Sequence, residues 1–158
     1  MQQLKIGFFF ILGMILFLGS FYLFLKQPAP TTNNRQLTTN QAILRIGEKT
    51  IPVEIADTVE ARTLGLSGRK SLEHNSGLLF VFENPSLYNF WMKDMHFAID
   101  IVWIDENWTV VDIDEAVSPE TFPTAFTPST AVNYVLELNS GDASRLGIDI
   151  GSKLYLTR

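Results

Sequence analysis

The stretch AIDIVWIDENWTVVDID, residues 98–114, sets the fold class of this chain. Positions 99, 101 and 103 are apolar and alternate with positions 100, 102 and 104, as side chains do on the two faces of a β-strand. The polar run Asp105, Glu106 and Asn107 suits a turn into a second strand. Two strands joined by a short turn form an antiparallel hairpin, so the stretch favours a mainly β fold.

The same kind of pattern recurs through the rest of the chain. Further strands are predicted at residues 42–47, 50–57, 77–82, 88–92, 133–138 and 152–157. A helix capped by Asp57 is predicted over residues 58–66, and Ser140 is expected to begin a short helix that ends at Gly147. This order predicts an antiparallel β-sandwich or a partly closed barrel with two short helices.

The amino terminus carries a membrane segment ahead of this domain. Residues 6–25 hold no charge, and Lys5 and Lys26 bracket them. At about 1.5 Å per residue such a helix spans the roughly 30 Å hydrocarbon layer. We therefore expect a cytoplasmic tail at residues 1–5, a transmembrane helix at 6–25, a flexible linker at 26–42 and an extracytoplasmic domain at 43–158. Cleavage of the segment as a signal peptide, with secretion of the domain, is the alternative.

Charge and composition exclude several classes of function. After Lys26 the chain has 10 basic residues against 17 acidic ones, which gives a formal charge of −7. Such a domain does not attract nucleic acid. The chain has no cysteine and only two histidines, His74 and His96, which are not at metal-ligand spacing. We expect no bound metal and no cofactor.

A candidate binding surface surrounds the run FWMKD at residues 90–94. In an extended strand Trp91 and Lys93 project from the same face, so an aromatic ring and a cation lie side by side. Asp94 follows directly, and Arg69, at the end of the first predicted helix, could add a two-pronged donor. The partner of such a surface would be a small molecule, a glycan or a protein of the cell envelope.

Two further carboxylates join the candidate site from within apolar runs. Asp100 lies in AIDIVW and Glu137 in VLEL, where an ionised carboxylate needs donors around it. One interpretation is structural, with Arg69 and Lys93 pairing with Asp94, Asp100 or Glu137. A second is a cell-envelope hydrolase that uses those carboxylates as acid or base. A third is a structural protein of an envelope complex, which predicts an exposed apolar patch and no pocket. Whether the protein is an enzyme stays open at this point.

The order of several motifs is similar to that of a known family. The motifs are GLSGR (65–69), GLLFVF (77–82), FWMKD (90–94), IDIVWID (99–105), VLELNSG (135–141) and GIDIG (147–151). Residues 46–156 thereby resemble the bacterial and archaeal domain of unknown function 192 family. Ser67 and Met95 depart from its usual residues, as does the pair Ala98 and Ile99. The resemblance implies a compact, mainly β fold, often with an export or anchor segment, and no established reaction.

Overall fold

The computed structural model describes residues 40–157 of the 158-residue chain. The predicted membrane segment, residues 6–25, and the predicted linker up to residue 39 lie outside the described residues. Within residues 40–157 no helix is long and apolar enough to cross a membrane. The described part of the chain is already in a strand at Asn40, slightly before the expected start of the domain at residue 43.

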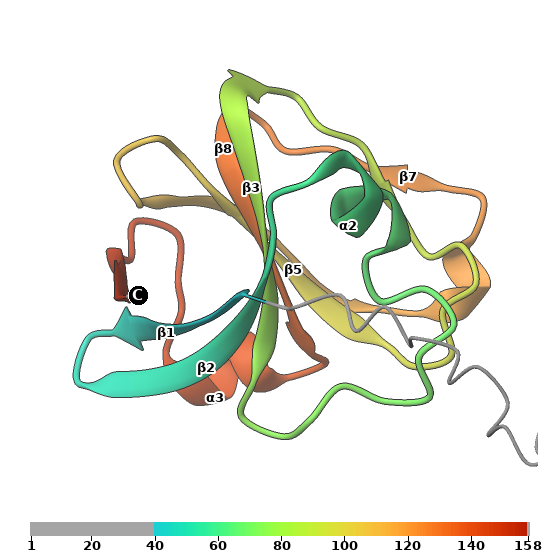
Figure 1. Cartoon of the computed structure of the whole chain (residues 1–158), viewed down its shortest axis with the longest axis horizontal. Helices are drawn as coiled ribbons and strands as arrows, with labels where there is room; N and C mark the ends of the chain where they lie inside the picture. Colours follow the sequence, from blue (N-terminus) through green and yellow to red (C-terminus); the bar gives the residue numbers. More distant parts are fainter. Residues whose placement is uncertain (1–39, 158) are drawn as a thin grey trace, which may run out of the picture. The chain divides into compact units, whose positions relative to one another are not determined.

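Seven strands form one curled sheet (Figure 1). They are β1 (Asn40–Ile46), β2 (Lys49–Ala56), β3 (Gly77–Ser86), β5 (Ile99–Ile104), β6 (Val110–Val117), β8 (Val132–Asn139) and β9 (Leu154–Thr157). Their order across the sheet is β6-β5-β8-β3-β2-β1-β9. The hairpin predicted from residues 98–114 is confirmed, because β5 and β6 are adjacent and antiparallel.

The sheet curls until its two edge strands meet at one end. Thr109, directly before β6, forms an isolated antiparallel bridge with Lys153, directly before β9. The amide of Val110 also donates a hydrogen bond to the Ser152 carbonyl at 2.9 Å. The result is a half-barrel. The prediction of a mainly β fold with partial barrel closure and two short helices is therefore confirmed for the described residues.

Both faces of the central strands of this sheet are apolar. The inner face of the half-barrel carries a core that includes Leu79 of β3, Leu136 of β8 and Val102 of β5. The outer face carries a second core, to which Phe80 and Trp103 belong. Consecutive residues of a strand point to opposite faces, so these central strands are buried on both sides. The position of a polar residue within such a strand thus decides which core surrounds it.

A helical crossover makes β2 and β3 parallel, which differs from the antiparallel sheet that the sequence predicts. The helix α2 (Val59–Leu64) follows β2 and packs against the outer core through Ala61. Parallel neighbours require a crossover of this kind because a tight turn cannot join them. Thr58, rather than Asp57, caps the helix, and its hydroxyl accepts a hydrogen bond from the Ala61 amide at 3.1 Å.

The other short helix, α3 (Asp142–Leu146), packs on the inner face, where its Ala143 joins the inner core. Gly141 rather than Ser140 is the residue before its first turn, and its backbone is left-handed with φ at 85°. Glycine adopts this conformation without a steric penalty, whereas a serine would not. Gly147 ends the helix as predicted.

A small two-stranded ribbon completes the outer layer. β4 (Phe90–Trp91) pairs antiparallel with β7 (Ala125–Phe126), and the short 3₁₀ helix η1 (Pro119–Thr121) precedes β7. The strand predicted over residues 88–92 is therefore much shorter, and the sequence did not predict β7. Ala61 of α2 and Phe126 of β7 both pack against the outer core, so the outer face has two covering elements.

Candidate functional site

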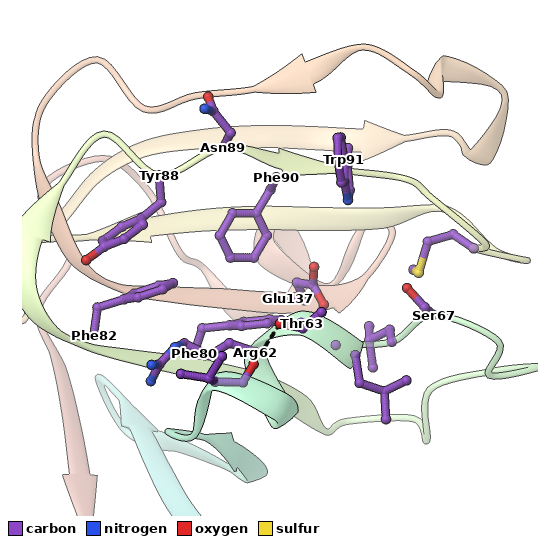
Figure 2. Close-up of a pocket in the computed structure, with 15 residues that line it drawn as sticks. Arg62, Thr63, Ser67, Phe80, Phe82, Tyr88, Asn89, Phe90, Trp91 and Glu137 are labelled. Atoms are coloured by element: carbon purple, nitrogen blue, oxygen red, sulfur yellow. Dashed lines mark hydrogen bonds between the residues drawn. The ribbon is translucent and has the colours of Figure 1, made fainter.

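A cavity of about 260 Å³ lies on the outer face and is lined by α2, the turn after it, β3 and β4 (Figure 2). Pockets for small molecules usually enclose about 300 to 1,000 Å³ and are mostly apolar with a few polar groups. The cavity lies slightly below that range and suits a small ligand. Five aromatic residues line it: Phe80, Phe82, Tyr88, Phe90 and Trp91.

Contacts between rings hold this aromatic lining in place. The Phe90 ring meets Phe80 edge-on with a centroid separation of 4.8 Å, and meets Trp103 in the same way at 5.4 Å. Phe82 and Tyr88 stack with centroids 3.6 Å apart. The edge-on arrangements are favourable because the positive edge of one ring meets the negative face of the other. The aromatic part of the cavity is thus formed before any ligand arrives.

Trp91 lines the cavity and is also 58% exposed to solvent. Its ring meets Phe122 edge-on at 6.3 Å. The sequence placed Lys93 on the same strand face as Trp91, but the strand ends at Trp91 and Lys93 lies in a turn. Asp94 follows in that turn with φ at 57°. The side chains of Lys93 and Asp94 are exposed and do not line the cavity.

The turn contributes to the site through its backbone. The Ser67 hydroxyl donates to the Lys93 carbonyl at 3.0 Å, and the Gly68 amide donates to the Asp94 carbonyl at 2.8 Å. Ser67 and Gly68 belong to the turn that follows α2, so these bonds join the two sides of the cavity. Their effect is to fix Trp91 relative to the helix.

Glu137 is the acidic group of the cavity. It lies on β8 between Leu78 of β3 and Ile101 of β5, and only 6% of its surface is exposed. Figure 2 shows its carboxyl among the side chains that line the cavity. Its Oε2 is buried and has no hydrogen-bond partner among the described residues. Buried polar atoms are nearly always hydrogen-bonded, so this oxygen lacks a partner that a ligand could supply.

Burial raises the pKa of the Glu137 carboxyl to about 8, and the positive charge of Arg69 acts in the opposite direction. Burial disfavours the charged form because the surrounding side chains replace water poorly. At neutral pH the carboxyl of the free protein is therefore mainly protonated and can also donate a hydrogen bond.

Arg69 lies near Glu137 but binds a different carboxylate. Its Nη1 and Nη2 donate to the two oxygens of Glu54 at 2.7 and 2.8 Å. Glu54, Leu78 and Glu137 occupy matching positions on β2, β3 and β8, which explains the proximity. The hydrogen bond to Glu54 is the main cause that raises the pKa of Arg69. Glu54 was not named from the sequence, and Arg69 does not line the cavity.

Asp100 is fully buried, but on the opposite side of the sheet. Its Oδ1 accepts a hydrogen bond from the Ala116 amide at 2.9 Å, and its Oδ2 accepts one from the Ala143 amide at 3.0 Å. Ala116 has φ at 52° and lies where the β5 and β6 register shifts. Asp100 thus holds a bulge of β6 and the first turn of α3, and it does not line the cavity.

Sequence reasoning named Trp91 and Glu137 but missed most of the lining. The missed aromatic residues are Phe80, Phe82, Tyr88 and Phe90. A signal was present, because residues 80–91 contain five aromatic side chains within 12 positions. One face of a single strand would not bury so many aromatic side chains, so their number could have indicated an aromatic pocket.

The arrangement can bind a ligand more readily than it can perform acid and base catalysis. Among the candidate carboxylates Asp94, Asp100 and Glu137, only Glu137 lines the cavity. A paired acid and base must both reach the reacting atoms. No group of three His, Cys, Asp or Glu side chains within residues 40–157 could hold a metal ion.

A second hollow, of about 540 Å³, lies beside the inner core. Trp108 and Tyr134 line it and stack with ring centroids 4.0 Å apart, and Tyr155 lines it as well. No charged side chain contributes to its lining. It therefore offers apolar surface without the acidic group that distinguishes the first cavity.

Two solved structures are similar to this domain. A protein from Sinorhizobium meliloti 1021, described as a candidate transcription regulator, has 28% identity and a TM-score of 0.67, covering 73% of this chain and 92% of its own. A protein of unknown function from Novosphingobium aromaticivorans has 26% identity and a TM-score of 0.65, covering 73% of this chain and 83% of its own. No curated protein sequence matches the chain.

The family resemblance drawn from the motifs is confirmed by the sequence profile that matches residues 42–156. That profile is the one described as Uncharacterized ACR, or DUF192. The match takes in every strand of the curled sheet. The chain therefore belongs to the domain of unknown function 192 family.

Proposed function

We propose that this protein is a membrane-anchored, extracytoplasmic binding domain that takes a small organic molecule into the cavity beside Trp91. The observation that carries the proposal is the buried Oε2 of Glu137, which has no hydrogen-bond partner among the described residues and lies in a cavity with five aromatic lining residues. An unsatisfied buried oxygen costs about 1 to 3 kcal/mol, and a bound ligand that donates to it would recover that cost.

A small molecule fits this cavity better than a glycan or an envelope protein. The volume of about 260 Å³ leaves room for one compact group rather than an extended chain. The hydroxyls of Thr63 and Ser67 already donate to backbone carbonyls, so few free groups remain to bind the many hydroxyls of a sugar. Specific binding of a protein would need a far larger contact area.

The hydrolase interpretation has less support. Asp100 lies on the inner face with both oxygens hydrogen-bonded, and the exposed Asp94 is outside the cavity lining. Glu137 would have to act alone. The regulator description belongs to the similar Sinorhizobium protein, and the acidic balance of this chain argues against binding to DNA.

The anchor in the proposal comes from the uncharged residues 6–25 with Lys5 and Lys26 at their ends. A uniform anchored population should stay with the membrane after alkaline carbonate extraction and lose its domain to external protease in spheroplasts. Release of a shortened chain into the medium would instead favour cleavage and secretion.

Binding is tested by ligand-observed NMR with a library of small aromatic and alkyl compounds against the full chain in lipid nanodiscs. The NMR signals of a compound that binds should change in the presence of the wild type, and this change should be lost with the Trp91→Ala and Phe90→Leu variants. Lys93→Ala is the matched control, because its exposed side chain lies in the same turn but outside the cavity. Binding that survives both cavity substitutions, or no binding by any compound, would contradict the proposal.

A further inference from the structure

We propose that the ligand of the Trp91 cavity is an organic ammonium compound, whose apolar part lies among the aromatic rings while its charged nitrogen contacts the Glu137 carboxylate. This inference rests on the proposed function and names the chemical class of the ligand. It follows from which polar groups of the cavity are already engaged, and from the charges around Glu137.

Most polar side chains of the lining are committed to the protein itself. Thr63 Oγ1 donates to the Val59 carbonyl at 2.7 Å, and Ser67 Oγ donates to the Lys93 carbonyl at 3.0 Å. The Oδ1 atom of Asn89, another lining residue, accepts a hydrogen bond from Thr127 at 2.7 Å. Glu137 is the acidic side chain of the lining and its Oε2 has no partner among the described residues, and a carboxylate selects a cation.

Arg62, the basic residue of the lining, is fixed by contacts within the protein. Its Nη1 donates to the Asp57 and Val81 carbonyls at 2.6 and 2.9 Å, and its guanidinium lies 5.3 Å from the centre of the Phe82 ring. These contacts tie the guanidinium to the end of the cavity formed by Phe82. It has no ion pair with Glu137 among the described residues.

Among the described residues, the charged neighbours of Glu137 form no ion pair with it. Arg69 is the cation whose field reaches the Glu137 carboxyl, but it is paired through two hydrogen bonds with Glu54. The strand neighbours of Glu137 are Leu78 and Ile101, which carry no charge. A ligand cation would therefore meet a carboxylate that has no ion-pair partner of its own.

The aromatic lining favours a cation as well. The negative face of a Trp, Tyr or Phe ring attracts an ammonium group within about 6 Å, and more strongly where water is excluded. A neutral ligand would gain only the apolar contact. The aromatic rings suit the apolar part of an aryl- or alkylammonium compound, and the Glu137 carboxylate suits its charged nitrogen.

This pairing makes binding dependent on pH in a defined direction. The Glu137 pKa of about 8 means that the free carboxyl must lose its proton before it can pair with a cation. Affinity for an ammonium ligand should therefore rise about tenfold per pH unit as the pH approaches 8 from below. It should level off above that pH, until the ligand loses its own proton. A neutral ligand of the same shape should show no such rise.

The test compares 2-phenylethylammonium with its neutral analogue 2-phenylethanol. Both are titrated into the full chain in lipid nanodiscs, with empty nanodiscs as the blank, and binding is followed by NMR. The ammonium compound should bind the wild type, and Glu137→Gln should weaken it about tenfold or more while 2-phenylethanol binding changes less than about twofold. Glu115→Gln, at an exposed position of β6, is the matched control and should change neither affinity.

Three results would overturn the ammonium assignment. The first is equal binding of both compounds with no effect of Glu137→Gln, which would leave the cavity as a binding site for neutral molecules. The second is ammonium binding that perturbs Trp108 and Tyr134 of the second hollow instead of Trp91. The third is an absence of binding by the ammonium compound. Binding of other compounds from the library would then show that the cavity is a binding site but not one for ammonium compounds. The pH dependence of the wild type provides an independent readout if Glu137→Gln fails to fold.

Discussion

Asp100 and Glu137 are both buried acids on neighbouring strands, yet their surroundings are opposite. Both oxygens of Asp100 accept hydrogen bonds from backbone amides, whereas Oε2 of Glu137 has no partner among the described residues. Asp100 lies on the inner face, opposite Leu138, and Glu137 lies on the outer face. A buried carboxylate that the protein satisfies by itself serves the fold, and one that it leaves unsatisfied is available to a ligand.

The pairing register of β5 and β8 places Asp100 and Glu137 on opposite faces of the sheet. Glu137 and Leu138 are consecutive on β8, so their side chains point to opposite faces of the sheet. Leu138 belongs to the inner core, and its pairing with Asp100 places that carboxylate beside the amides of α3 and of the β6 bulge. Glu137 faces α2 and β4, where polar lining side chains such as Thr63 and Ser67 are hydrogen-bonded to other groups of the protein.

Removal of the Asp100 carboxylate should have the largest effect on stability. Asp100→Ala leaves the buried Ala143 amide and the partly buried Ala116 amide without an acceptor, so the free energy of unfolding should fall by about 2 to 4 kcal/mol. Asp100→Asn retains one acceptor and should cost less. Chemical denaturation of the full chain in nanodiscs, followed by tryptophan fluorescence, measures both. A loss below about 0.5 kcal/mol for Asp100→Ala would contradict the structural role given to this residue.

Glu137→Gln should instead stabilise the protein near neutral pH, which sharpens the contrast. The folded state holds the Glu137 proton up to pH about 8, whereas an unfolded chain releases it near the ordinary value of 4.5. The wild type therefore loses stability as pH rises between these two values, by at most about 1.4 kcal/mol per unit.

Because glutamine cannot release a proton, Glu137→Gln should be more stable than the wild type by about 3 kcal/mol near neutral pH and nearly equal in acid. Denaturation of both proteins across this pH range measures the difference. Parallel pH profiles for the two proteins would show that the Glu137 carboxyl is not kept protonated by burial.

Arg69→Ala should have the smallest effect on stability and a clear effect on Glu137. The Arg69–Glu54 pair is partly exposed, with side chains 32% and 26% accessible, so its loss should cost only about 0.5 to 1 kcal/mol. The pKa of Glu137 should rise above about 8, because the positive charge that lowers it is gone and Glu54 is left unpaired. Lys93→Ala is the matched control, and a lower Glu137 pKa in Arg69→Ala would contradict the account.

Local periodicity was sufficient to predict much of the fold. The alternation in residues 98–114 and the apolar runs 77–82 and 133–138 each became a strand of the sheet. The parallel pairing of β2 and β3 depends on where α2 crosses the sheet, and no local pattern records it. β7 has two residues and therefore no period to detect.

The site was less predictable because its residues resemble core residues in sequence. Phe80, Phe82 and Phe90 are typical of buried strands, and only the placement of α2 leaves space beside them. Asp100 and Glu137 looked equivalent, since each is an acid within an apolar run. Their difference comes from strand register and from the elements that cover each face, which depend on contacts distant in sequence.

The most direct test of the role given to Glu137 is a ¹³C NMR titration of its carboxyl carbon in the full chain, without and with 2-phenylethylammonium. We expect a midpoint at about 8 in the free protein and a lower midpoint when the ammonium compound is bound, because the bound cation favours the carboxylate. A midpoint near 4.5 that does not respond to the compound would contradict that role.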